Sequence, residues 1–330
     1  VKNFPDMELF YYSDKGDYAG VLDKNDIFSL IDLETEKTSR WEAVKWFEFA
    51  PDGTWVAVSF DKNGKNSIEL VDTQSLQKYV ILKSNDGTFS NLVWNSQGTG
   101  LAFMESKLDT IHNLSYTLLY EFRNSPLPKL RSLHPEGQMG FPHNTYMDTQ
   151  SKMFYAADGE RIFFYVRPKN YLKRNLDSIK NNVQVWKGDD PWIYPRQLIH
   201  ADPAFGPWLI QWKPDQKEVL EIANETLPTA YLLPQENYAL LFDKMQYEPS
   251  FQHDGDADFY VMDLKTKSKK RMLEKHTTDF NNQYASPNGN YITYYKDKKW
   301  WVYNMAMDSH TAVSVNIPFN LETTDHHSSN

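Results

Sequence analysis

The sequence repeats one kind of turn, and this repeat limits what the chain can fold into. In each copy a β-like run leads into a short turn that carries Pro, Asp or Asn and, in most copies, ends in glycine. Proline fixes φ, Asp and Asn bond to the local backbone, and glycine accepts a positive φ that strains other residues. Each copy therefore predicts a β-hairpin. The clear copies are Ala50-Pro51-Asp52-Gly53, Asn95-Ser96-Gln97-Gly98, Ala157-Asp158-Gly159 and Ser286-Pro287-Asn288-Gly289, and looser ones are Ser13-Asp14-Lys15-Gly16 and Lys213-Pro214-Asp215-Gln216.

The segments beside these turns are rich in β-branched and aromatic residues, which favour strands. Val44–Phe49 precedes the Pro51 turn and Thr54–Phe60 follows it, and Tyr291–Tyr295 follows the last turn. A second phrase closes several apolar strands: an apolar residue, then Asp, then Thr or Ser three residues later. It occurs at Ile31-Asp32-Leu33-Glu34-Thr35, Val71-Asp72-Thr73-Gln74-Ser75 and Met262-Asp263-Leu264-Lys265-Thr266.

Two hairpins in succession make a four-stranded unit, and the spacing of the units indicates the architecture. The glycines at positions 16, 53, 98 and 159 are 37 to 61 residues apart, and four-stranded propeller blades recur at roughly 40 to 50 residues with insertions in loops. The sequence therefore predicts an all-β fold, a β-propeller of four-stranded antiparallel blades. We expect a single domain over residues 1–330.

The blade count is either six or seven. Blade-like units fall near residues 8–41, 44–82, 88–133, 151–200, 205–273 and 280–317. The fifth unit contains a further turn-like stretch, Pro234-Gln235-Glu236-Asn237, so it is either one blade with a long insertion or two units. An incomplete or open ring is a second possibility, and its exposed strand edges would favour a homodimer.

The composition limits the classes of binding partner that we expect and bears on the cellular compartment. The formal net charge of −9 argues against nucleic acid, because neutralising phosphates requires a basic face. No stretch approaches the roughly 20 apolar residues of a membrane-spanning helix. Cysteine is absent, so neither disulfides nor thiolate metal sites are expected. The missing cysteines fit a bacterial periplasm or surface as readily as the cytoplasm, so this criterion leaves the compartment open. The chain opens at Val1 without a signal-like segment, which is typical of a mature or excised product. Our expectation for the location is the periplasm or the cell envelope.

Candidate metal ligands do not form a recognisable site. Asp254-Gly255-Asp256-Ala257-Asp258 resembles the start of a calcium loop, but the required glycine and glutamate positions hold Phe259 and Lys265. An acidic hairpin tip is the simpler interpretation. The nine histidines are scattered, and the adjacent pair His326 and His327 would point to opposite faces of a strand. We expect no metal and no cofactor.

Aromatic residues in the middle of the chain form the candidate binding site. Their rings could stack on a peptide or a sugar, or they could fill the wedge between neighbouring blades. These residues are Trp186, Trp192, Tyr194, Trp208 and Trp212.

Several segments resemble a family of enzymes. The Pro51 turn with its flanks resembles the repeat of TolB-like and S9-peptidase propellers. Asn182-Val183-Gln184-Val185-Trp186, then Asp190-Pro191, then Pro195-Arg196-Gln197-Leu198, is similar to a segment of Bacteroidetes prolyl-oligopeptidase-type (S9, dipeptidyl-peptidase-like) serine peptidases. Further segments are similar to that family and follow one another in the same order as there: Ser286–Ile292, Trp300-Trp301-Val302-Tyr303, Asn316-Ile317-Pro318 and Thr324–His327. The chain departs from the pattern at Gly188 and at His327-Ser328.

The resemblance implies a propeller that gates and selects peptides for an α/β-hydrolase domain. The sequence contains no Gly-x-Ser-x-Gly nucleophile elbow, so we expect no catalytic residue in this chain. Its partner would be a peptide substrate, presented to a hydrolase domain outside the sequence. The alternative is a stand-alone TolB-like envelope propeller that binds a protein or glycan. A third interpretation is a propeller hydrolase or lyase with its own site.

Overall fold

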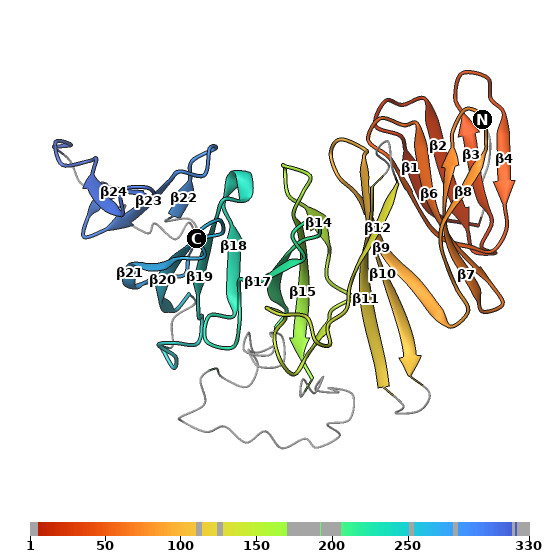
Figure 1. Ribbon diagram of the computed structural model, residues 1–330. Coiled ribbons are helices and arrows are strands. Elements are labelled where there is room, and N and C mark those ends of the chain that lie inside the picture. Colours follow the sequence, from red (N-terminus) through yellow and green to blue (C-terminus); the bar gives the residue numbers. More distant parts are fainter. Residues whose placement is uncertain are drawn as a thin grey trace, which may run out of the picture. The chain divides into compact units, whose positions relative to one another are not determined.

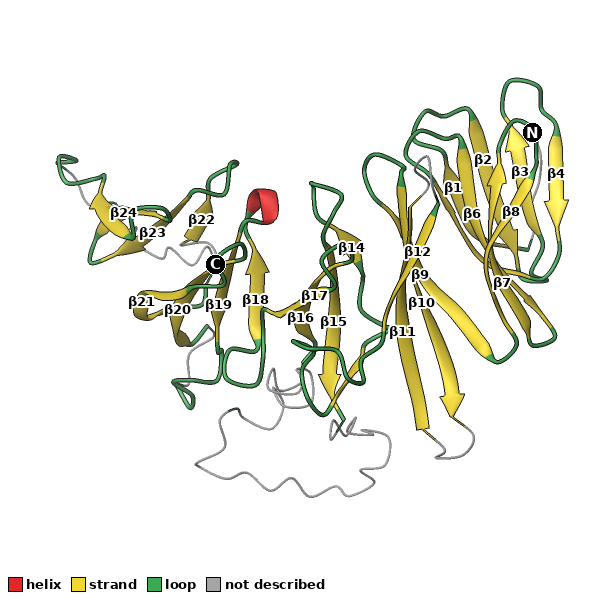
Figure 2. Cartoon of the chain, in the orientation of Figure 1, coloured by secondary structure: helices red, strands yellow, loops and turns green. Residues whose placement is uncertain are grey.

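The chain is built almost entirely of β-strands. A computed structural model describes residues 6–109, 114–123, 128–169, 192, 206–250, 254–279, 283–318 and 321. These residues form six antiparallel sheets, each made of strands that follow one another in the sequence (Figure 1). A short 3₁₀ helix, η3 (Pro234–Glu236), is the one helical element of the described part (Figure 2). The prediction of an all-β fold of four-stranded propeller blades is confirmed.

The chain divides into two compact units. One comprises Val1–Lys169 with Ile210–Glu221, and the other comprises Asn170–Leu209 with Ile222–Asn330. Within the described ranges, no helix is both long and apolar enough to cross a membrane.

The first unit holds three regular sheets and most of a fourth. The first sheet runs β1 (Met7–Tyr12), β2 (Tyr18–Asp23), β3 (Phe28–Asp32), β4 (Thr38–Trp41), and the second runs β5 (Val44–Phe49), β6 (Trp55–Lys62), β7 (Lys65–Asp72), β8 (Lys78–Ser84). The third has β9 (Gly87–Trp94), β10 (Gly100–Asp109), β11 (Leu114–Arg123) and β12 (Lys129–Leu133).

In the fourth sheet the first strand is interrupted. Its order is β13 (Thr145–Met147), β15 (Ile162–Pro168), β16 (Trp208–Lys213), β17 (Glu218–Glu221), and β14 (Phe154–Tyr155) also pairs with β15. The β13 and β14 segments pair with opposite ends of β15. Asp148 anchors the chain between them, because it accepts hydrogen bonds from Ser151 Oγ at 2.6 Å and Arg167 Nε at 2.9 Å.

The second unit holds two further sheets. The fifth sheet runs β18 (Thr229–Leu232), β19 (Tyr238–Phe242), β20 (Asp256–Asp263), β21 (Lys269–Thr277). The sixth runs β22 (Gln283–Ala285), β23 (Tyr291–Lys296), β24 (Lys299–Asn304), β25 (Ser309–Ala312). The stretch 205–273, treated above as one unit, thus gives β16 and β17 to one sheet and four strands to the next. None of the six sheets combines strands from both ends of the chain.

Five copies of the repeated turn share one geometry. In five copies the glycine has φ between 67° and 75°, and its amide donates to a carbonyl three residues earlier. The bonds are Gly16 to Ser13 (2.8 Å), Gly53 to Ala50 (2.8 Å), Gly98 to Asn95 (3.0 Å), Gly159 to Ala156 (2.9 Å) and Gly289 to Ser286 (2.8 Å). A sixth copy starts at Leu233, where Glu236 takes the glycine place with φ 46°. The hairpin prediction is confirmed at these positions.

The turns of neighbouring sheets lie against one another. A Cβ built on Gly53 would face Ser13 of the preceding turn, and one built on Gly98 would face Asp52. One on Gly159 would overlap the Gln97 side chain, and one on Gly289 would overlap the Pro234 carbonyl. All four glycines provide positive φ, but only Gly289 also leaves room for the backbone of the turn before it, since a Cβ at Gly53 or Gly98 would make ordinary contact and Gln97 is a flexible side chain.

The Asp phrase closes the hairpin between the third and fourth strands of a sheet. Asp32, Asp72 and Asp263 each accept backbone amide bonds on Oδ1 from the residues two and three positions later, at 2.7 to 3.0 Å. This is an Asx turn, which the short carboxylate favours. In the last sheet Asn304 Oδ1 accepts one such bond, from the Met307 amide three positions later, at 3.1 Å.

Apolar side chains pack between sheets. One cluster joins the first two sheets around Phe28 and Phe47, another joins the second and third around Ile68 and Phe103, and a third fills the second unit around Phe259. Inner strands such as β6 are buried on both faces, so they carry continuous apolar runs instead of an alternating pattern.

The first strand, at the edge of its sheet, differs from the buried inner strands. In β1, five of six residues are exposed, including Phe10 (38%), Tyr11 (44%) and Tyr12 (59%). One edge of β1 pairs with β2, and no described strand pairs with the other edge.

Candidate functional site

The aromatic residues proposed from the sequence fall in different settings. Trp186 and Tyr194 lie outside the described residues. Trp208 and Trp212 lie on β16 and are 7% and 2% exposed, and Trp192 is 7% exposed. The rings described are thus buried, as packing between sheets requires, and the binding role of the set stays a prediction.

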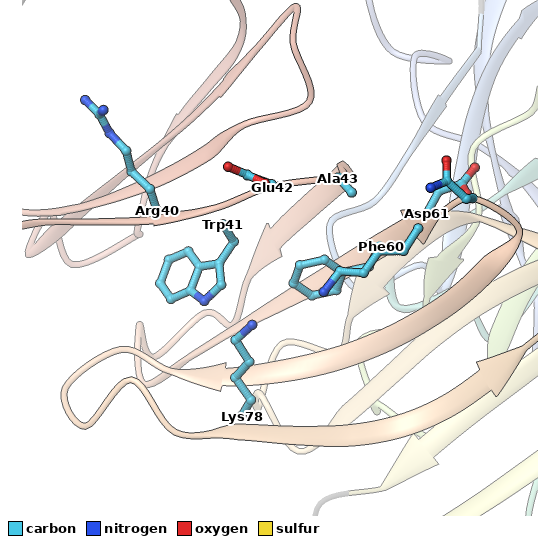
Figure 3. A pocket seen from close by; sticks show the side chains of 9 residues that line it. Arg40, Trp41, Glu42, Ala43, Phe60, Asp61 and Lys78 are labelled. Atoms are coloured by element: carbon cyan, nitrogen blue, oxygen red, sulfur yellow. The ribbon is translucent and has the colours of Figure 1, made fainter.

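A groove of about 640 Å³ lies between the first two sheets of the first unit (Figure 3). The end of β4 and the link to β5 form one side, and the end of β6, its hairpin and the start of β8 form the other. Pockets for small ligands or short peptide segments have this size. The lining residues are Arg40, Trp41, Glu42, Ala43, Phe60, Asp61, Lys62, Asn63 and Lys78.

Backbone hydrogen bonds fix both sides of the groove. Ala43 has φ 60°, and its carbonyl accepts the Asp61 amide at 2.9 Å, which joins the β4–β5 link to β6. On the other side, Asn63 (φ 55°) and Gly64 (φ 80°) form the β6–β7 turn. Asn-Gly is the preferred pair for a two-residue hairpin because both positions need positive φ. The groove is therefore a product of the fold and does not depend on a flexible loop.

Two aromatic rings form the apolar wall. Trp41 stacks on the fully buried Phe28, with ring centroids 5.6 Å apart and an interplanar angle of 24°. Phe60, 2% exposed, lies opposite (Figure 3). Because Phe28 is enclosed by the core, the Trp41 ring is held in one orientation.

Two lysine ammonium groups lie against this wall. Lys78 Nζ is 4.9 Å from the Phe60 centroid and 5.7 Å from the Trp41 centroid. Lys62 Nζ is 5.1 Å from the same Phe60 ring. These are cation–π distances. Burial lowers the pKa of Lys78, Glu69 acts to raise it, and the nearby Lys62 lowers it further.

The positive charges in the groove have little compensation. Lys78 has one ion pair, with Glu69 at 3.9 Å, the outer limit for such a contact. Within the described residues, no carboxylate lies at ion-pair distance from Lys62 or Arg40. By contrast, Lys45, outside the groove, pairs with Asp26 at 2.6 Å.

Two carboxylates also line the groove, on the side away from Lys78. Figure 3 shows Glu42 beside Ala43, across from the Lys78 ammonium, and Asp61 at the far end. Asp61 Oδ1 accepts the Gly64 amide at 3.3 Å, so it also supports the hairpin. Both carboxylates thus lie apart from the Lys78 ammonium, although Asp61 and Lys78 come from the same pair of elements, β6 and β8 (Figure 3).

A buried charge network joins the third and fourth sheets. Glu121 is fully buried and pairs with Arg123 at 2.5 Å and Arg131 at 2.7 Å, and Arg131 also pairs with Asp215 on the β16–β17 turn. Burial, and then the charge of Glu121, raise the pKa of the nearby Tyr155 hydroxyl. Every charge has its counterpart, so this network holds sheets together and offers no open site.

A second polar cluster lies in the second unit. The Tyr294 hydroxyl and His310 Nδ1 are 2.7 Å apart, and Tyr303 donates to Asp308 at 2.7 Å. Burial, with the charge of Asp297, raises the pKa of Tyr294 to about 12, and burial lowers the pKa of His310. In the described ranges, no three His, Asp or Glu side chains gather closely enough for a metal ion.

The acidic run predicted as a hairpin tip is instead part of a strand. β20 begins at Asp256, and Asp258 is 5% exposed. Burial acts to raise the pKa of Asp258, but hydrogen bonds from the Lys275 amide and the Tyr247 hydroxyl, both at 2.9 Å, outweigh it and lower that pKa. Asp258 therefore anchors the segment before β20.

The groove residues were not among the predicted site residues. They come from three separate segments, and only the fold brings them together. One local signal was present, because Asn63-Gly64 between two apolar runs predicts a tight hairpin at this point. Nothing in the local sequence marks Lys78 or Trp41.

No protein-family model matches the sequence, and no curated protein matches it. Among solved structures, dipeptidyl peptidase 4 from Porphyromonas gingivalis is 11% identical over 96% of this chain and 47% of that chain, with a TM-score of 0.49. The tricorn protease is 10% identical over 93% of this chain and 30% of that chain, with a TM-score of 0.43. The β-propeller domain of the trilobed protease from Pyrococcus furiosus, which has an open velcro topology, is 12% identical over 94% and 85%, with a TM-score of 0.43.

The chain spans less than half the length of the first two of these proteins. At such identities and TM-scores the likenesses do not distinguish one function from another. The fold assignment rests on the six sheets and their turns.

Proposed function

We propose that this chain is the propeller part of an S9-type serine peptidase, where it gates and selects peptides for a hydrolase domain outside the sequence. The observation that carries the proposal is the ordered resemblance running from Val183 through Trp186 and Pro195 to Trp300 and Asn316. Residues 170–191 and 193–205 of that stretch lie outside the described part, so the argument there is one of sequence alone.

The described blades are compatible with a filtering role. Each sheet is an antiparallel meander, and the sheets of the first unit are joined by packed apolar faces and by the buried Glu121 network. A rigid assembly of this kind can restrict access by size while contributing no catalytic group. The nucleophile has to come from another domain, because the sequence has no Gly-x-Ser-x-Gly. We also propose a periplasmic or envelope location, where such a peptidase would meet peptides.

The proposal is tested on the natural gene product. A fluorophosphonate probe labels the activated serine of a serine hydrolase, so the polypeptide that contains this sequence should be labelled in extracts of the source cells. Mass spectrometry of the labelled band identifies both the propeller peptides and the modified serine.

The proposed gating role leads to a second expectation, which can be tested separately from the labelling of the serine. Removal of the propeller from the labelled enzyme should increase cleavage of long or folded substrates relative to a dipeptide-type substrate. An unlabelled product whose reading frame contains no nucleophile elbow would contradict the proposal and favour a stand-alone propeller that binds a protein or glycan.

A further inference from the structure

We propose that the groove between the first two sheets binds a peptide segment through a single acidic side chain. The choice of a carboxylate rests on the groove itself. The choice of a peptide rests on the proposed function.

The two ammonium groups near the Phe60 ring favour an anion at this end of the groove. Arg40, Lys62 and Lys78 line the groove, and among the residues that the structure describes Lys78 alone of the three has an ion pair, at 3.9 Å. Lys62 and Lys78 both lie near the Phe60 ring, and the charge of Lys62 lowers the pKa of Lys78, which is the sign of repulsion between like charges. A carboxylate bound beside the Lys78 ammonium would offset this repulsion and accept charge-assisted hydrogen bonds.

Partial burial makes the Lys78 contact more favourable than a surface ion pair. Its side chain is 35% exposed and lies against two rings. Exposed ion pairs contribute little because water screens both charges. An ammonium group already partly removed from water, and held by the Trp41 and Phe60 rings, has less water to lose when a ligand arrives.

The other side of the groove limits the ligand to one negative charge. Glu42 and Asp61 lie across from the Lys78 ammonium (Figure 3), and they would repel a polyanion such as nucleic acid. Their oxygens are instead suited to accept peptide N–H groups. The Trp41 face suits an apolar or aromatic residue next to the acidic one. The expected ligand is therefore an acidic residue beside an aromatic residue.

Binding is measured by titration calorimetry on the chain itself, without a hydrolase domain. The probe is acetyl-Ala-Glu-Phe-Ala-amide, and its matched control has glutamine in place of glutamate. We expect the glutamate peptide to bind at least about tenfold more tightly, the size of one charge-assisted hydrogen bond. Raised salt should reduce this preference.

Variants assign the preference to the groove. Lys62→Gln combined with Lys78→Gln should abolish the preference for glutamate over glutamine, whereas Lys45→Gln, which removes an already paired lysine at the surface, should leave it intact. Circular dichroism and thermal unfolding check that the variants fold. Equal binding of both peptides, or equal loss in the Lys45 variant, would overturn the proposal.

The failure of this inference is distinguishable from failure of the proposed function. Digalacturonate, an acidic disaccharide, tests whether the groove prefers a glycan. Its binding, with no binding of the peptide, would overturn the peptide assignment. A labelled serine peptidase whose isolated propeller ignores acidic peptides refutes the groove inference alone. Peptide binding by a chain with no associated hydrolase supports the groove and refutes only the peptidase proposal.

Discussion

Two glycines of the repeated turn differ in what lies beside them. Gly16 has φ 75° with nothing within 4 Å of a built Cβ, whereas a Cβ on Gly289, at φ 68°, would overlap the Pro234 carbonyl. Alanine at either position costs about 1–2 kcal/mol for the left-handed conformation, and overpacking at Gly289 adds about 1–3 kcal/mol. We expect Gly289→Ala to reduce the free energy of unfolding in urea clearly more than Gly16→Ala. Equal losses would show that contact between neighbouring turns adds nothing.

His276 should make stability depend on pH. Its Nε2 atom is buried without a hydrogen-bond partner among the described residues, and its ring lies 5.9 Å from the Tyr294 ring. Burial and then Lys296 lower the pKa of His276, against the opposing charges of Asp256 and Asp297. The unfolded chain, with a histidine pKa near ~6.5, therefore takes up the proton first as pH falls.

The direction in which stability changes with pH follows from that order of protonation. The stability that the neutral His276 contributes is complete above the unfolded pKa and is lost as pH falls through the folded pKa. Urea midpoints measured at pH 7.5 and 5.5 should differ in the native chain, and the difference should shrink in His276→Gln. An unchanged difference in the variant would assign the pH dependence to other groups.

At the level of elements, Glu121 joins β11 to β12 and, through Arg131, to the β16–β17 turn. Glu121→Gln leaves two arginines without a buried counter-charge, so we expect a loss of about 3–5 kcal/mol in the free energy of unfolding. The matched control is Asp215→Asn at the exposed end of the network, which should cost less than about 1 kcal/mol. Denaturant titration measures both, and a small loss for Glu121→Gln would mean that water compensates the arginines.

Among the features of the secondary structure, the hairpin turns could be predicted best from the sequence. Positive φ at glycine and backbone hydrogen bonding by Asp are local effects. The turns at Gly53 and Asp72 can therefore be recognised from a few neighbouring residues of the sequence. The turn at Leu233 was harder to recognise because Glu236 stands where glycine is expected. The interrupted first strand of the fourth sheet could not be predicted, since β13 and β14 are short and the chain between them is held by contacts such as those of Asp148 with Ser151 and Arg167.

At the scale of the whole molecule, the sequence indicated blades but not which hairpins share a sheet. The Pro214 turn looks like the start of a unit, yet the strands beside it, β16 and β17, join β15. Sheet membership depends on which apolar faces meet, and this is a long-range property. The groove has the same origin: Trp41, Phe60 and Lys78 belong to β4, β6 and β8, and none carries a signal of its own.

The exposed first strand has a consequence for how the protein survives in solution. Met7–Tyr12 is a six-residue window of high β propensity with one charge and no proline, the composition that nucleates fibrils when an edge is free. During storage, we expect light scattering to rise with protein concentration and thioflavin signal to follow. Phe10→Lys places a gatekeeper charge on a residue that is already 38% exposed and should delay this without changing the fold. The strand that begins the first blade would thus also set the shelf life of the molecule.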